Sequence, residues 1–122
     1  MTTNAKIISA LSGIVGGKIW SIQKPVSEDP SVFIVFNPEN EYLDYGDDRD
    51  QTAETSWQIH WYAKGTANYI TPRRQIRDAL RDAGFLIEPS PYVTYEPESG
   101  STAGGTQTGY THMTIVCRLE DE

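Results

Sequence analysis

The chain has two histidines, His60 in the stretch TSWQIHWYAKG and His112 in the stretch YTHMTIVCRL. Two imidazoles and a loop aspartate form a ligand set that could hold a divalent metal and support a small metal-dependent enzyme. Both histidines lie in segments that alternate polar and apolar residues, so they would meet only if two strands paired in a suitable register. The neighbours of His60 on its side of the alternation are hydroxyl, amide and amine groups, which favours a solvated histidine with no second ligand in reach. We therefore expect no metal, no cofactor and no catalytic residue.

The acidic segment 39–54, ENEYLDYGDDRDQTAE, combines seven carboxylates with one arginine. Such a density of carboxylates invites comparison with a calcium loop, which needs a glycine in its middle and a bidentate glutamate at its end. Counted from Asp44, those places hold Arg49 and Thr55. We therefore interpret the segment as a solvated acidic loop or hairpin extension, and not as a calcium site.

The chain carries a single cysteine, Cys117, and a formal net charge of −7. One cysteine excludes an internal disulfide, and its alternation with Met113, Ile115 and Leu119 predicts a small buried thiol. The negative charge repels phosphate backbones, so we expect no sequence-directed binding of nucleic acid. The sequence contains no phosphate loop, nucleophile elbow or HExxH motif. It also shows neither a secretion signal nor an apolar run long enough to span a membrane, which favours a soluble protein made in a cytoplasm.

Two helices are expected to position these residues. Residues 4–15 repeat apolar side chains at helical spacing, with Asn4 as the candidate N-cap and a double glycine as the stop. Residues 71–83 repeat the pattern, with Thr71 as the candidate cap, a proline at the first helical position and Gly84 just beyond the end.

The strands are expected where polar and apolar residues alternate. In the segment 55–64, Trp57, Ile59 and Trp61 fall on one dry face. The segment FLIEPSPYVTYE is typical of a strand that is interrupted by Pro89 and Pro91 and lies at an edge or a bulge. The remaining predicted strands are 18–22, 31–37 and 110–119. Together these elements predict one α+β domain over residues 1–122, with two helices packed on one face of a mainly antiparallel four- to five-stranded sheet. The predicted order is α-β-β-(acidic segment)-β-α-β-β, with mobile segments near 39–54 and 97–109.

The second predicted helix holds four of the ten basic residues of the chain. They could form a patch for an acidic partner, or they could lie on a solvated helix surface next to aspartates at i,i+4 spacing. The sequence leaves both interpretations open for these residues, which are Arg73, Arg74, Arg77 and Arg81.

The order of the motifs is informative over nearly the whole chain. LSGIVGGKIWSIQKP precedes SVFIVF, and YGDD, SWQIHWYAKG, IRDALRDAGF and YVTYEPESG…TGYTHMTIVCRLE follow. This order resembles that of the tail-completion or tail-terminator proteins of long-tailed bacteriophages and prophages. In that family a glycine-marked helix end leads to a short strand and a proline. A Y-x-D-D segment, a strand ending in W/Y-x-K, a helix ending in A-G-F and a last hairpin with a Y-x-H element then follow.

The resemblance implies a non-enzymatic virion protein that assembles with copies of itself into a ring, typically of six. Such a ring sits on the head-proximal end of the tail tube, stops tube growth and docks the tail to the head connector. Its location would be the head–tail joint, with the host cytoplasm as the place of assembly and no membrane involved. DNA would pass through without specific binding, along acidic residues that we expect to be Asp44, Asp47, Asp48 and Asp50. The alternatives are a head-closure or minor capsid protein of the same joint, or a small metal-dependent enzyme using His60 and His112.

Overall fold

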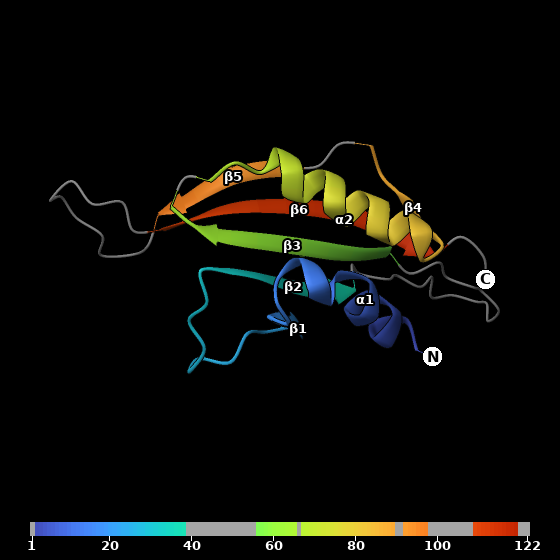
Figure 1. The fold of residues 1–122 in the computed structure, drawn as a ribbon, viewed down its shortest axis with the longest axis horizontal. Helices are drawn as coiled ribbons and strands as arrows, with labels where there is room; N and C mark the ends of the chain where they lie inside the picture. Colours follow the sequence, from blue (N-terminus) through green and yellow to red (C-terminus); the bar gives the residue numbers. More distant parts are fainter. Residues whose placement is uncertain (1, 39–55, 66, 90–91, 98–108, 120–122) are drawn as a thin grey trace, which may run out of the picture.

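The computed structural model describes residues 2–38, 56–65, 67–89, 92–97 and 109–119 of the chain. Within these ranges the protein is α+β, with two α-helices and one six-stranded mixed sheet (Figure 1). The predicted α+β class with two helices is therefore confirmed. The predicted count of four to five strands is wrong, and the sheet is mixed because one of its strand pairs is parallel.

The first helix, α1, spans Thr3–Leu11 and continues into a single 3-10 turn, η1, at Ser12–Ile14. Its N-cap is Thr2, whose hydroxyl accepts a hydrogen bond from the Ala5 amide, and not the predicted Asn4. The chain then leaves the helix through the double glycine, whose φ angles of 61° and 84° are accessible to glycine at little cost.

The sheet has the order β1-β2-β3-β6-β4, and β5 also pairs with β6. Strands β1 and β2 are parallel, and all other pairs are antiparallel. The strands are β1 at Ile19–Ser21, β2 at Val32–Pro38, β3 at Ser56–Lys64, β4 at Phe85–Ile87, β5 at Tyr92–Pro97 and β6 at Gly109–Leu119.

The extra strand comes from the segment that contains Pro89. The sequence predicted one interrupted strand there, but the structure has two separate strands, β4 and β5, which pair with different parts of β6. Proline cannot donate a hydrogen bond to a ladder, so a proline-containing stretch separates two strands more readily than it bulges one. The element order after the second helix is consequently three strands and not two.

The second helix, α2, spans Ile70–Asp82. It begins before the predicted cap, Thr71, because the side chain of Asn68 accepts a hydrogen bond from the Ile70 amide. Its end agrees with the sequence, since Gly84 has a φ of 96° and its amide donates to the Arg81 carbonyl.

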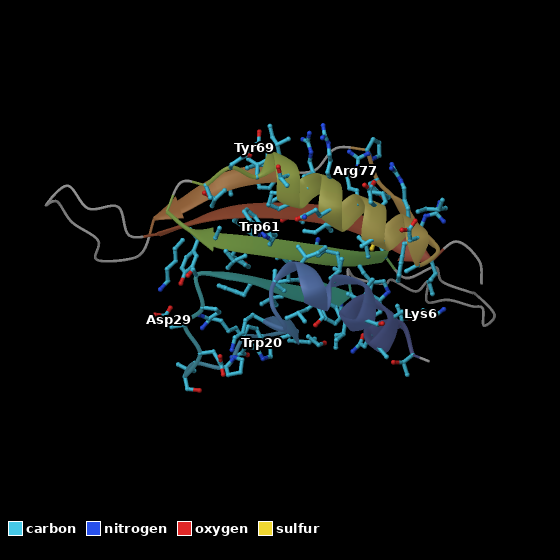
Figure 2. The ribbon with its side chains drawn as sticks, in the orientation of Figure 1. Lys6, Trp20, Asp29, Trp61, Tyr69 and Arg77 are labelled. Atoms are coloured by element: carbon cyan, nitrogen blue, oxygen red, sulfur yellow. The ribbon has the colours of Figure 1, made fainter. Side chains whose placement is uncertain are left out.

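One core joins both helices to the sheet, and both helices lie over the same side of the sheet (Figure 1). Alternate residues of β3 supply its centre, including Trp61, which is 3% exposed (Figure 2). Truncating a fully buried leucine or isoleucine in such a core to alanine costs about 2–5 kcal/mol of folding free energy. The other core residues include Ile7 and Leu11 of α1, Ile76 and Leu80 of α2, Ile34 and Phe36 of β2, and Met113, Ile115 and Cys117 of β6.

The connection from β3 to α2 is held by one buried hydroxyl. Thr111 on β6 is 6% exposed, and its Oγ1 donates to the Gly65 carbonyl at 2.7 Å. The same oxygen accepts a hydrogen bond from the Ala67 amide at 3.0 Å. Because both backbone groups belong to the loop, this threonine fixes where α2 starts relative to the sheet.

Candidate functional site: the outer sheet face and the arginine helix

The sheet face turned away from the two described helices carries a row of stacked rings. The register pairs Phe33 of β2 with Tyr62 of β3, and Tyr62 with His112 of β6. The centroids of the Phe33 and Tyr62 rings are 4.8 Å apart, and those of the Tyr62 and His112 rings are 4.4 Å apart. Directly opposed residues on paired strands lie close enough for such contacts. We call Phe33, Tyr62 and His112 the aromatic row.

The aromatic row has its own small packing centre at Phe33. Trp20 meets the Phe33 ring edge-on with centroids 6.2 Å apart, and Tyr110 does so at 5.8 Å. The ammonium of Lys24 lies 5.7 Å from the ring centroid, where the negative face of the ring attracts a cation. Phe33 is consequently only 5% exposed although neither helix covers it. These contacts hold the rings in this part of the outer face in fixed positions.

The two histidines meet beside the aromatic row. His60 Nδ1 lies 2.8 Å from His112 Nε2. The Thr114 hydroxyl is 3.2 Å from the first of these nitrogens and 3.3 Å from the second. The other ring nitrogen of His60, Nε2, is 3.2 Å from Gln58 Oε1.

This geometry corrects the expectation that His60 is a solvated residue without a second ligand in reach. His60 is half-buried, and a second imidazole lies within hydrogen-bonding distance. Its directly opposed neighbour on β6 is Thr114, so the two histidines are diagonal neighbours across the β3–β6 pair. Within the described ranges, no group of three or more His, Cys, Asp or Glu side chains is placed to hold a metal.

We call Arg73, Arg74, Arg77 and Arg81 the arginine face of α2. It belongs to the helix layer of the molecule, whereas the aromatic row belongs to the sheet. Figure 2 places Tyr69 and Arg77 on the side of α2 away from α1. Arg74 and Arg81 are exposed, whereas Arg73 and Arg77 are half-buried. The Arg73 guanidinium lies 5.9 Å from the Tyr69 ring centroid.

These arginines are not neutralised by the aspartates of their own helix. Among the residues that the structure describes, no ion pair joins them to Asp78 or Asp82. The Nε atoms of Arg73 and Arg77 are buried and have no hydrogen-bond partner in that same part of the chain. Both interpretations of these arginines, a patch for an acidic partner and a solvated helix surface, therefore stay open.

A groove of about 470 Å³ runs between α1 and α2. Its floor is made of small side chains, which include Ala10, Ala79 and Ala83. Lys6 and Asp82 flank it with opposite charges. Small residues allow the groove to accept a side chain from outside, but they provide no catalytic group.

Several predicted features cannot be placed. The expected lumen residues and most of the expected mobile segments lie outside the described residues; these are Asp44, Asp47, Asp48 and Asp50, with 39–54 and 98–108. The described helices include none that is long and apolar enough to cross a membrane.

Comparison with known proteins adds no relative: no protein-family model matches the chain, and no curated protein matches it.

Sequence patterns alone did not identify the aromatic row. The sequence places Phe33 in the predicted strand 31–37 and Tyr62 in the predicted strand 55–64, and the alternation within each strand does not show that their rings meet. The available signal was the recurrence of aromatic and imidazole side chains on the same side of two strands, with Tyr62 on one and Tyr110 on the other. The cross-strand register turns that recurrence into a ring stack.

Proposed function

We propose that the protein is a tail terminator, or tail-completion protein, of a long-tailed bacteriophage or prophage. Copies of the chain would form a ring, a hexamer by the family resemblance, on the head-proximal end of the tail tube. The ring would stop tube growth and dock the tail to the head connector or a head-closure protein. Its chemistry would be non-covalent, and its place in the virion would be the head–tail joint.

The position of the quoted motifs within the fold supports this proposal. LSGIVGGKIW covers the end of α1, the turn η1 and β1, and SWQIHWYAKG covers β3 with the glycine that follows it. IRDALRDAGF covers the main part of α2 and the first residue of β4. These three motifs therefore coincide with an element or with the boundary between two elements, as expected if the resemblance extends to the architecture.

The observation that carries the proposal is that the domain presents two different outer surfaces on its two layers. The aromatic row lies on the sheet face away from the helices, and the arginine face lies on α2. A subunit of a joint must contact its neighbours, the tube and the connector, so it needs more than one interface. Aromatic and arginine side chains are the types enriched where protein interfaces bind most strongly.

The sheet also has one open edge that suits a neighbouring copy. The Glu88 amide donates to the Val116 carbonyl, so the even-numbered residues of β6 direct their backbone groups towards β4 and β5. In β5, Tyr92 and Thr94 face those residues in the register, which leaves the backbone groups of Val93 directed outward. No described strand pairs with this outer side of β5. A strand from another chain could add here, and ring closure would cover the edge.

The opposite edge is less suited to strand addition. On β1 the Ile19 amide donates to the Gly17 carbonyl, and the Ser21 carbonyl accepts from the Gln23 amide. These local bonds use backbone groups that an added strand would need. A head-to-tail ring would therefore use the β5 edge together with a different surface of the next copy.

The proposed passage for DNA rests on charge. The formal charge of −7 is multiplied in a ring, and an acidic lumen would let DNA slide with little adhesion. We assign Asp44, Asp47, Asp48 and Asp50 to that lumen as part of the proposal. The alternative is a head-closure or minor capsid protein of the same joint, which would also need more than one protein interface.

The arginine face provides a test with a matched control. The variant Arg74→Gln/Arg77→Gln is compared with Lys18→Gln/Lys64→Gln, which removes the same charge from exposed pairs with Glu28 and Asp29. Exposed pairs contribute about 0–1 kcal/mol to stability, so the lysine variant should fold. The arginine variant breaks no ion pair of the described residues, and circular dichroism checks that it folds as well. Binding to purified tail tubes, and in a separate assay to the head connector, is measured by co-sedimentation at low and high salt.

The arginine variant should bind tubes, or the head connector, at least about 10-fold more weakly at low salt, with a reduced salt dependence, while the lysine variant keeps wild-type binding. Equal binding by all three proteins to both partners would remove the arginine face from the proposal. No binding of the wild type to either partner would refute the proposed function itself.

A further inference from the structure

The two histidines form a close pair that plays no part in the proposed function. His60 and His112 project from neighbouring strands, and the pairs His60–Thr114 and Tyr62–His112 fix their diagonal relation. Stacking on Tyr62 restrains the His112 ring, with centroids 4.4 Å apart and an angle of 12° between the ring planes. The two imidazoles are therefore held together by the sheet and not by a flexible loop.

The hydrogen bonds define which nitrogen of His60 carries a lone pair. Gln58 Oε1 can only accept, so His60 Nε2 carries the hydrogen that it donates across 3.2 Å. In the neutral ring Nδ1 is then the lone-pair nitrogen, and it accepts from His112 Nε2 at 2.8 Å. An outer acceptor that fixes the tautomer, most often a carboxylate, a backbone carbonyl or water, commonly supports a metal-binding histidine, and the Gln58 oxygen can act in the same way.

We propose that His60 Nδ1 and His112 Nε2 chelate one divalent late-transition-metal ion such as nickel or copper, which imidazole nitrogens bind well. Two nitrogens bound to one ion at about 2.0–2.1 Å lie about 2.9–3.4 Å apart, depending on the coordination angle. The sheet already holds the two nitrogens 2.8 Å apart as a hydrogen-bonded pair, so both can reach one ion after the rings turn. The ion then replaces this hydrogen bond, and the hydrogen on His112 Nε2 moves to Nδ1.

The remaining coordination positions are open to the Thr114 hydroxyl and to solvent. That oxygen lies 3.2 Å and 3.3 Å from the two nitrogens, so it borders the proposed ion position. No third His, Cys, Asp or Glu joins the pair among the described residues. The site is therefore a two-imidazole chelate, which predicts exchangeable binding and not a permanently held structural ion.

The composition of the chain makes this site easy to isolate experimentally. His60 and His112 are its only histidines, and Cys117 is its only cysteine. Cys117 is completely buried, and burial raises the pKa of its thiol to about 12, so no thiolate competes for the ion at neutral pH. Carboxylates are further competitors, but single carboxylates bind nickel more weakly than a pair of imidazoles on one ion.

The experiment titrates tag-free full-length protein with Ni²⁺ by calorimetry, and repeats the titration with His60→Gln and His112→Gln. Mg²⁺ is the control ion for the carboxylates. We expect one Ni²⁺ per chain for the wild type and at least a 10-fold loss of affinity in each variant, with unchanged binding of Mg²⁺. Ni²⁺ binding that both variants retain would overturn the proposal, as would the absence of binding by the wild type at millimolar Ni²⁺.

A second measurement needs no variant. Substoichiometric Cu²⁺ broadens the NMR signals of nearby protons, so the imidazole signals of both histidines should disappear first, together with those of Thr114. Selective broadening elsewhere, with both imidazole signals intact, would contradict the assignment. This inference does not depend on the proposed function, and the tube-binding test does not involve the ion.

Discussion

Burial of Cys117 should make the fold less stable at alkaline pH by an amount that the structure sets. The residue lies on β6, opposite Trp57 and Ile87, and has no exposed surface. Burial raises the pKa of its thiol from 9.0 to about 12, because desolvation penalises the thiolate. The unfolded chain therefore loses this proton near pH 9, while the native protein keeps it until about pH 12.

The sign of the effect follows from proton binding. Between these two pKa values the unfolded state binds fewer protons than the native state, so stability falls as the pH rises. The stabilisation of the native state by the protonated, buried thiol is fully present below pH 9.0 and is lost towards pH 12. At about pH 10.5 the loss is about 2 kcal/mol, and it approaches about 4 kcal/mol over the whole interval.

Guanidinium unfolding at about pH 7.5 and about pH 10.5, with reductant present, measures this loss in the wild type and in Cys117→Ala. Alanine leaves a small cavity and lowers stability at both pH values. Other titrating groups are common to both proteins, so they cancel in the comparison. The loss of stability between the two pH values should be about 2 kcal/mol smaller in the variant. Equal losses in the two proteins would refute the buried placement of the thiol.

Two further predictions concern the loop anchor and the open edge. Thr111→Val keeps the shape but leaves the Gly65 carbonyl and the Ala67 amide without their partner, which should cost about 1–3 kcal/mol of unfolding free energy, whereas Thr111→Ser should cost less. Denaturant unfolding distinguishes them, and equal stability of the two variants would contradict the anchoring role. Val93→Pro removes an outward-directed amide from β5 and some side-chain packing against the core, so the monomer should stay folded with slightly lower stability while self-association is lost. Thr94→Pro removes a β6-directed amide and should destabilise the fold itself by more. Sedimentation velocity and circular dichroism measure both effects, and rings formed by Val93→Pro would exclude the β5 edge as the contact.

Local sequence patterns were sufficient to predict a helix or a strand wherever one face of that element is buried. The alternation around Trp61 predicted β3, and the apolar spacing through Ile76 and Leu80 predicted α2, because burial on one face imposes its period on the sequence. The glycine after α2 was also predictable, since its left-handed conformation is disfavoured for other residues.

Features that depend on pairing between distant strands could not be predicted in this way. The separation of β4 from β5 depends on how each pairs with β6, which the proline spacing alone does not specify. His60 and His112 are 52 positions apart in the sequence, and a one-residue shift between β3 and β6 would place them on opposite faces. The aromatic row depends on the same register. The acidic residues proposed for the lumen lie outside the described residues, so their assignment rests on the family resemblance and on charge.

The most direct test of the proposed function is the length of tail tubes assembled with and without this protein. Tube protein is polymerised alone or with the purified chain, and tube lengths and ends are measured by negative-stain electron microscopy. Tubes exposed to the protein should stop growing and carry a ring-shaped cap at one end. Tubes that keep growing with bare ends, at protein concentrations well above those of the tube ends, would contradict it.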